Sequence, residues 1–451
     1  MATLQTLLFT PLLAALVARL LAPRPQLMAA GGALTAGVLW LWLRTVEPSG
    51  TAVLFWGQPM ALTVETQALL QLLLAGLFIL FGLAIVFPSG DWFVAGGLVG
   101  FAFLAASLLT LTFAVALALF LLATGALALT VQSGRAGSVR GSFRYLLAVL
   151  LAVPLLLLVN WQLAAQPTEW LLPPGELAAL AVLLLLAGFP FHVWLLAVAN
   201  EAEPLPLALV AGWAPIVPLA LLFQTLATYP NLVDATFRQL IWLSGGLTLL
   251  VAGVLALTAV HLRRAIGNVL LLNMALTILC FTLPELVGWE TAVTLQVGRF
   301  GGLLLVAGGW WLVKQHQPEW PLDRLPAGAG RQSPWGLALL GVGLFSLLGL
   351  PFTLGFAGQW RVLTAVAGLA NSGGIPWWLP ALALLGLGLG AAGVLRLLAA
   401  LLASVADAPQ NANAPLWQQG VVGLVLLLSL WLALNPGWIT AVAATLYPLI
   451  N

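Results

Sequence analysis

The chain has 451 residues, of which 62% are hydrophobic and 6% are charged, and its mean hydropathy is +1.10. Soluble domains carry roughly 25% charged residues, so this composition excludes an ordinary soluble domain and predicts an integral membrane protein. The arginines behind the net charge of +2 are scattered through loops, which argues against a nucleic-acid partner, and the lone Cys280 excludes an internal disulfide.

Apolar runs of about 20 residues recur along the chain, each long enough to cross a hydrocarbon core of about 30 Å. The sequence therefore predicts an all-α polytopic membrane protein with about fourteen transmembrane helices. The first run lacks a basic region and a cleavage site, so we expect it to be retained as a helix. The twelfth run is too long for one crossing and contains Pro351, so we expect two half-helices or a bent helix. The expected spans are 4–22, 26–43, 67–87, 92–108, 112–131, 143–164, 176–198, 205–227, 238–261, 265–284, 289–312, 334–368, 376–402 and 416–446.

The basic residues are distributed unequally between the two sets of loops. Loops after even-numbered spans hold only Arg44 and Arg238. The asymmetry is the positive-inside pattern and predicts both termini on the non-cytoplasmic side, with loop 313–335 as a linker across the inner face. The basic residues in the other loops are Arg19, Arg24, Arg135, Arg140, Arg144, Arg263, Arg264, Lys314, Arg324 and Arg331, and Arg396 lies near the inner end of the thirteenth span.

A proline-broken stretch interrupts the seventh span between Gly188 and Pro206. Broken helices at membrane depth are where transporters handle ions. The pattern around Pro190, Gly-x-Pro-Phe, recurs around Pro351 five spans later, and an odd offset inverts the topology of one copy. This favours two inverted five-helix repeats with broken helices over chance recurrence of a short motif. The predicted segments are an N-terminal three-helix segment (1–90), a first repeat (91–228), a second repeat (237–403) and a C-terminal helix (404–451).

Four blocks of the sequence also carry a family resemblance. They are Pro190-Phe-His-Val-Trp194 with Pro204-Leu-Pro206, Ala256–Arg264, Ser346–Trp360 and Gly393–Arg396. In order and spacing they resemble the antiporter-like subunits of respiratory complex I and of Mrp cation/proton antiporters, most closely the N-type (NdhB-like) member. The resemblance implies a subunit without a cofactor or catalytic site of its own. Its partners would be lipids and other membrane subunits of a complex I/NDH- or Mrp-type assembly. The assembly would have quinone oxidoreductase or antiport activity and would lie in a bacterial inner or thylakoid membrane.

Such subunits are thought to move protons along a midplane line of charged residues. The resemblance implies a glutamate in span five, lysines in spans seven and eight, and a lysine or glutamate in span twelve. Desolvation lowers the pKa of a buried lysine and a nearby carboxylate raises it, so the pair can switch a proton on and off. The corresponding positions here are Ala116, Leu185, Ile216 and Gln359. Because none of these side chains can titrate, the sequence predicts a broken relay.

Three other residues form a candidate polar path. Arg299 lies in the middle of the eleventh span with Gln296 one helical turn away. Since arginine stays protonated in proteins, an anchor between helices or a lipid-headgroup contact is favoured over proton transfer. His192 either titrates near neutral pH or caps free backbone groups at the Pro190 break. Glu290, near the outer end of the Arg299 span, is expected to be solvated.

Four charged residues are expected at the inner face. Glu201 and Glu203 either bind Arg263 and Arg264, bind a neighbouring subunit, or form a solvated loop. The two arginines fit positive-inside anchoring. The chain has no phosphate-binding loop, and its three histidines and one cysteine are scattered, so no metal site is expected.

These observations predict an antiporter-like membrane-arm subunit that is degenerate in proton translocation and acts as a structural or docking subunit. The alternative is an active transporter or channel for protons, cations or a neutral solute that uses His192, Arg299 and trapped water.

Overall fold

The computed structural model describes residues 2–132, 139–165, 172–315, 328–403 and 415–446. Nearly all of them are helical, as predicted. Packing divides the chain into two compact units. Unit 1 contains Met1–Leu185, Glu201–Leu240 and Val442–Asn451, and unit 2 contains Leu186–Asn200 and Ile241–Ala441. This division does not test the four segments predicted from the sequence, which stay a prediction.

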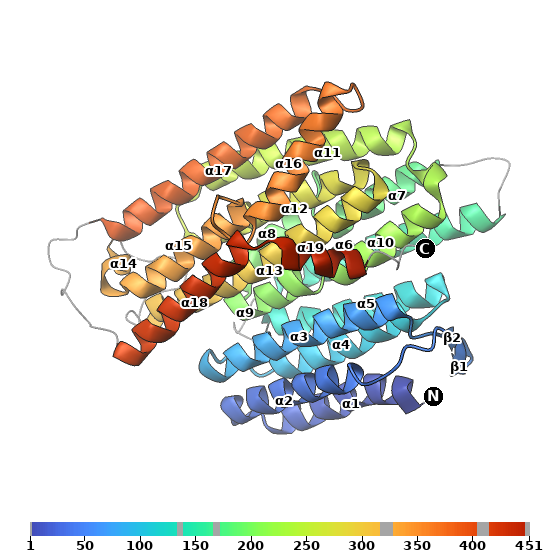
Figure 1. Ribbon diagram of the computed structural model, residues 1–451, viewed down its shortest axis with the longest axis horizontal. Coiled ribbons are helices and arrows are strands. Elements are labelled where there is room, and N and C mark those ends of the chain that lie inside the picture. The colour runs from blue at the N-terminus through green and yellow to red at the C-terminus, as the bar shows by residue number, and fades with distance from the viewer. Residues whose placement is uncertain (1, 133–138, 166–171, 316–327, 404–414, 447–451) are drawn as a thin grey trace. The chain divides into compact units, whose positions relative to one another are not determined.

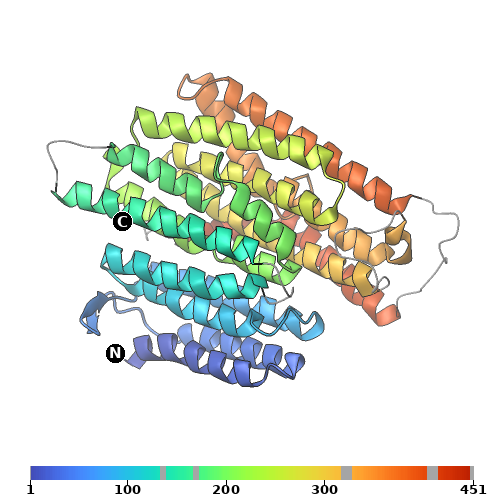
Figure 2. The ribbon, with the colours of Figure 1, turned by 180° about the vertical axis from the view of Figure 1, so that it is seen from behind.

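Unit 1 is a bundle of apolar helices in which consecutive helices mostly pack side by side (Figure 1, blue to green). Figure 2 shows α6 beside α5 from behind. Glycines allow this close packing, since a Cβ at Gly96 would lie 2.9 Å from the carbonyl oxygen of Ala126. Its elements are α1 (Ala2–Leu20), α2 (Pro25–Leu43), β1 (Val53–Phe55), β2 (Gln58–Met60), α3 (Val64–Val86), α4 (Phe93–Leu109), α5 (Phe113–Gln132), α6 (Arg140–Ala165), α7 (Pro174–Leu185), α9 (Pro204–Leu207), the π-helix η1 (Ala208–Trp213), α10 (Ile216–Thr228) and the 3-10 helix η2 (Pro230–Leu232).

The strands β1 and β2 form a short antiparallel hairpin that the sequence did not predict. Its two-residue turn is Trp56-Gly57, with φ of 51° and 77°. Positive φ at both turn positions matches the twist of an antiparallel pair. Trp56 is 83% exposed and its ring stacks on Phe55, so the hairpin presents an aromatic tip.

Unit 2 contains the long helix α13 and two segments with interrupted helices. Helix α15 packs along α13 (Figure 1) through glycine contacts, because a Cβ at Gly309 would lie 2.6 Å from the carbonyl oxygen of Gly336. Its elements are α8 (Val193–Glu201, whose last residue falls in unit 1), α11 (Ala235–Thr258, mostly in unit 2), α12 (Leu262–Leu279), the 3-10 helix η3 (Cys280–Thr282), α13 (Glu285–Gln315), α14 (Ala329–Gln332), α15 (Pro334–Leu348), α16 (Phe356–Asn371), α17 (Trp378–Leu402), α18 (Leu416–Leu434) and α19 (Gly437–Thr445, whose last residues fall in unit 1).

Both predicted helix breaks are present. Span seven is divided into α7 and α8, and span twelve into the half-helices α15 and α16. The predicted span over 416–446 contains a further break that the sequence did not predict, because α18 and α19 are bent by 68° relative to each other. In the described residues, ten helices are long and apolar enough to cross a membrane, or up to eleven if that bent pair is one span, so the number fourteen is not confirmed.

Candidate functional site

The break between α7 and α8 is held by two hydroxyl groups of α11. Phe189, which precedes the cis Pro190, donates its backbone N–H to Thr248 Oγ1 at 2.8 Å and accepts from Ser244 Oγ at 2.5 Å through its carbonyl. These bonds satisfy backbone groups that have no helical partner. The structure thus assigns the capping role to Ser244 and Thr248 and not to His192, whose ring stacks on Phe189 with centroids 5.8 Å apart.

We expect Thr248→Val to destabilise the protein by about 1–3 kcal/mol, because the variant leaves the part-buried N–H of Phe189 without an acceptor. Unfolding of the purified protein in detergent measures this. The control is Thr258→Val on the same helix, where the exposed hydroxyl bonds only to its own helix. Equal stability of Thr248→Val and Thr258→Val contradicts the capping role.

The second break follows the half-helix α15. Gly349 has φ of +64°, and the N–H groups of Gly349 and Leu350 return to the carbonyls of Ser346 and Phe345 at 3.1 and 3.0 Å, which is a Schellman-type ending. The carbonyl of Leu347 instead accepts from Gln359 Nε2 at 2.6 Å. Gln359 is 1% exposed, so the expected proton-path position holds a neutral amide that caps the half-helix.

A buried polar network joins α12, α13 and α15 around Arg299, which is 0% exposed. Its Nε donates to Asn273 Oδ1 and its Nη1 to Gln296 Oε1, both at 2.7 Å. Its Nη2 donates to Thr277 Oγ1 and, at 3.4 Å, to the carbonyl of Asn273. Asn273 Nδ2 in turn donates to the Leu347 carbonyl at 3.3 Å. The network therefore runs from the guanidinium to the same carbonyl that Gln359 caps.

This network holds a charge but offers no proton switch. Arg299 uses four hydrogen bonds to neutral acceptors and forms no ion pair with a carboxylate in the described part of the chain. The negative end of the α15 helix dipole, at Leu347, provides partial compensation through Asn273. Since arginine stays protonated, the geometry supports an anchor between helices, as the sequence favoured.

The remaining expected proton-path positions lie in unit 1 and are apolar and buried. Ala116, on α5, is 2% exposed, and its carbonyl accepts from Ser107 Oγ at 2.7 Å. Leu185 is the last residue of α7, and Ile216 is the first residue of α10, directly after the π-helix η1 and Pro215. The π-helix and the two helix breaks therefore occur in a chain whose expected proton-path positions carry no charged side chain.

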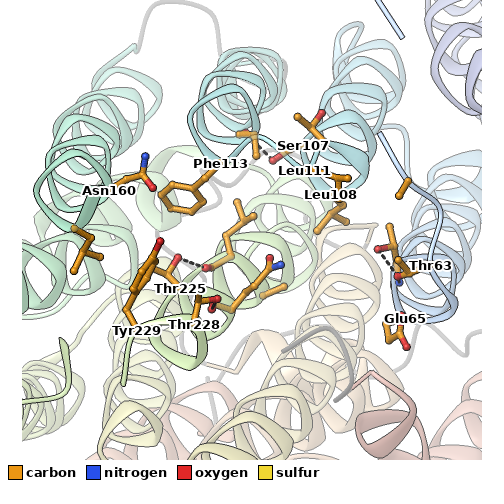
Figure 3. Close-up of a pocket in the computed structure, with 18 residues that line it drawn as sticks. Thr63, Glu65, Ser107, Leu108, Leu111, Phe113, Asn160, Thr225, Thr228 and Tyr229 are labelled. Carbon is orange, nitrogen blue, oxygen red and sulfur yellow. Dashed lines mark hydrogen bonds between the residues drawn. The ribbon is translucent and has the colours of Figure 1, made fainter. Parts of the chain in front are cut away.

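Ala116 also lines a cavity of about 560 Å³ in unit 1 (Figure 3). Its walls come from the start of α3, the end of α4, the start of α5, and parts of α6 and α10. Figure 3 shows Asn160, Phe113 and Tyr229 on one side of the cavity and Thr63 and Glu65 on the other. The lining residues are Ala61, Thr63, Glu65, Thr66, Ser107, Leu108, Thr110, Leu111, Phe113, Ala116, Asn160, Leu163, Ala220, Leu221, Gln224, Thr225, Thr228 and Tyr229.

The expected inner-face residues have mostly structural contacts. Glu201 accepts from the backbone N–H of Gly141 at 2.6 Å, at the start of α6, where a carboxylate also complements the helix dipole. Arg263 is 3% exposed, donates to the carbonyl of Asn200 at 3.0 Å and lies over the Trp310 ring. Arg264 is exposed. Glu203 directly precedes α9.

The sequence reasoning missed several polar partners. Glu290 is not simply solvated, because it forms an ion pair with Arg361 at 2.6 Å that joins α13 to α16. Asn273 and Thr277 were not singled out, although their spacing of one helical turn in the apolar α12 was a readable signal. His192 has no hydrogen bond to Arg299 or Gln296 within the described residues, so the three do not form one path there.

Sequence comparison places the chain among known proteins. No family model matches it. NADH-quinone oxidoreductase subunit N of Chromohalobacter salexigens is 27% identical over 263 residues, which are 56% of this chain and 53% of that protein. NADH-ubiquinone oxidoreductase chain 2 of Branchiostoma floridae is 29% identical over 192 residues, 42% of this chain and 50% of that protein. This chain is similar in sequence to membrane subunits of NADH-quinone and NADH-ubiquinone oxidoreductases. The matches span about half the length of these relatives.

Solved structures establish the antiporter-like fold along nearly the whole chain. This chain superposes on a chain of the archaeal membrane-bound sulfane sulfur reductase with a TM-score of 0.77, 14% identity, and coverage of 99% of this chain and 97% of the other. The Mrp complex of a Dietzia species gives a TM-score of 0.73 at 15% identity, with coverage of 99% of this chain and 97% of the other. Respiratory complex I of Thermus thermophilus gives a TM-score of 0.68 at 22% identity, with coverage of 96% of this chain and 98% of the other. The predicted fold class of this chain, a multi-pass helical membrane protein, is thereby confirmed.

Proposed function

We propose that this chain is a docking subunit of a complex I- or Mrp-type membrane assembly and that it does not move protons itself. The observation that carries the proposal is the hydrogen bond from the Gln359 amide to the Leu347 carbonyl. Gln359 stands at the position where a titratable side chain is expected. Ala116, Leu185 and Ile216 support it, because alkyl side chains cannot hold a proton.

The proposed partners are other membrane subunits, because the relatives and the structural neighbours are parts of multisubunit assemblies. The proposed location is a bacterial inner or thylakoid membrane. The proposed orientation has both termini on the non-cytoplasmic side and rests on the unequal distribution of arginines between the two sets of loops. One-sided labelling of a cysteine introduced near either end, in a Cys280→Ser background, tests the orientation. Affinity purification from the native membrane tests the assembly, and recovery of the chain alone after crosslinking contradicts it.

We expect proteoliposomes containing the purified chain to show no sodium- or gradient-coupled proton flux above that of empty liposomes. The physical reason is that the expected relay positions carry no group that can be protonated near neutral pH. A pH-sensitive dye inside the vesicles measures the flux, and a protonophore added at the end verifies that the vesicles are sealed. Saturable, ion-coupled flux overturns the docking proposal.

His192 gives the second candidate function, a transporter with a non-standard path. It lies at a membrane-depth break, and its Nδ1 is buried without a partner among the described residues. If flux is found, His192→Ala should abolish it, whereas the matched control His261→Ala, at the start of α12, should not. Equal effects of the two variants would exclude His192 as the proton carrier.

A further inference from the structure

The cavity of unit 1 contains polar side chains that the fold itself does not use. Glu65, Asn160, Gln224 and Tyr229 all line it, and none of their side chains has a hydrogen-bond or ion-pair partner among the described residues. By contrast, the cavity hydroxyls of Ser107 and Thr225 bond to the carbonyls of Ala116 and Leu221. One carboxylate, two amides and a phenol are therefore available to a ligand.

The charge of the cavity limits the class of ligand. Glu65 is the only charged residue among the described residues of the lining. A carboxylate at the edge of an apolar bundle is stabilised by a cation and disfavours an anion. With no lysine or arginine among these described lining residues, phosphates and carboxylates are disfavoured, including the phosphate of a phospholipid. Glu65 also lies in the first turn of α3, where a carboxylate complements the helix dipole, so its test needs a control matched for that effect.

The size and the walls limit the ligand further. About 560 Å³ falls within the roughly 300–1,000 Å³ of small-molecule sites, which is far more than a bare metal ion needs. No cluster of three or more metal-ligating side chains occurs in the part of the chain that the structure describes. Leu108, Leu111 and Phe113 provide apolar surface in the lining, and aromatic faces attract ammonium groups.

We propose that this cavity binds an organic monocation, with its ammonium group near Glu65 and its apolar body against Leu108, Leu111 and Phe113. The amides of Asn160 and Gln224 and the phenol of Tyr229 can accept or donate hydrogen bonds at the ligand's other end. The proposal goes beyond the docking role and does not depend on it, because every residue it uses lines this cavity in unit 1 and none is an expected proton-path position.

The test is equilibrium binding of tetramethylammonium and of butyl- to hexyltrimethylammonium to the full chain in a neutral detergent. We expect saturable binding whose affinity rises about fourfold per added methylene while the cavity accepts it. Glu65→Gln should weaken binding at least about tenfold, and Glu65→Asp should retain most of it. Glu176→Gln is the matched control, because Glu176 lies in the first turn of α7 and outside the cavity lining.

Three results overturn the proposal. The first is the absence of saturable binding by any ammonium probe. The second is equal binding by the wild type and Glu65→Gln. The third is a probe affinity that does not depend on the length of the alkyl chain, together with displacement of the probe by sodium. Thermal unfolding of each variant shows whether it is folded. Failure here leaves the flux and purification tests of the docking role unaffected, so the two proposals can be judged separately.

Discussion

Asn273→Leu should destabilise the protein by about 3 kcal/mol or more, because it leaves the Nε–H of a buried charged group without its acceptor. The substitution removes the Oδ1 acceptor of Arg299 Nε and one of the two donors to the Leu347 carbonyl. Both groups are fully enclosed, so water cannot replace the lost bonds. Unfolding in mixed micelles of a neutral detergent and sodium dodecyl sulfate, followed by circular dichroism, measures the change.

Two further variants isolate the charge as the cause. Asn268→Leu makes the same exchange at another buried position earlier in α12, where no bond to Arg299 is lost, and we expect a smaller effect. Arg299→Met combined with Asn273→Leu should recover at least half of the loss, because apolar replacement of a buried ionic group is often neutral or stabilising. If the double variant is no more stable than Asn273→Leu, the guanidinium is not the source of the cost.

Gly355→Ala should cost about 3 kcal/mol or more, at the upper end of the range for overpacked cores. A Cβ on Gly355 would overlap the backbone carbonyl oxygen of Ser346, which is part of the half-helix α15 and cannot rotate away. The same segment is fixed by the hydrogen bond from Gly355 N–H to Ser346 Oγ at 3.0 Å. We therefore expect the substitution to push the two half-helices apart and to lower thermal stability.

Gly388→Ala is the matched control for this effect. Gly388 lies within α17, and a Cβ there would meet no atom within 4 Å. Alanine is the better helix former by roughly 0.5–1 kcal/mol, so this variant should be neutral or slightly stabilised. If Gly355→Ala behaves in the same way, the close approach of α15 and α16 is not needed for stability.

The helix breaks were predictable because their cause is local. Proline removes a backbone donor and clashes with the preceding turn, and both Pro190 and Pro351 lie at interruptions. Proline alone is not sufficient, since Pro11 and Pro154 lie inside the continuous helices α1 and α6. The groups that satisfy the broken ends were not predictable. Ser244 and Thr248 lie far from the break at Pro190 in sequence, and ordinary serine and threonine residues within helices carry no sign of such a partner.

The candidate site was predicted in part. Arg299 was recognised because a charge in the middle of an apolar span is costly and therefore conspicuous, and its bond to Gln296 follows from helical spacing. Its bonds to Asn273 and Thr277, and the pairing of Glu290 with Arg361, depend on how α12, α13 and α16 pack. The hairpin at 53–60 and the cavity of unit 1 were missed because neither leaves a hydrophobic period in the sequence.

The sequence by itself determined that this is a multi-pass helical membrane protein, that helices are broken near Pro190 and Pro351, and that the expected relay positions cannot titrate. Each of these follows from composition, proline placement or side-chain chemistry, which need no partner in space. Only the tertiary structure decided that Gln359 and Asn273 share one carbonyl, that neutral dipoles surround Arg299, and that Glu65 faces a cavity. Hydrogen bonds and cavities join residues from different helices, and helix packing sets their geometry.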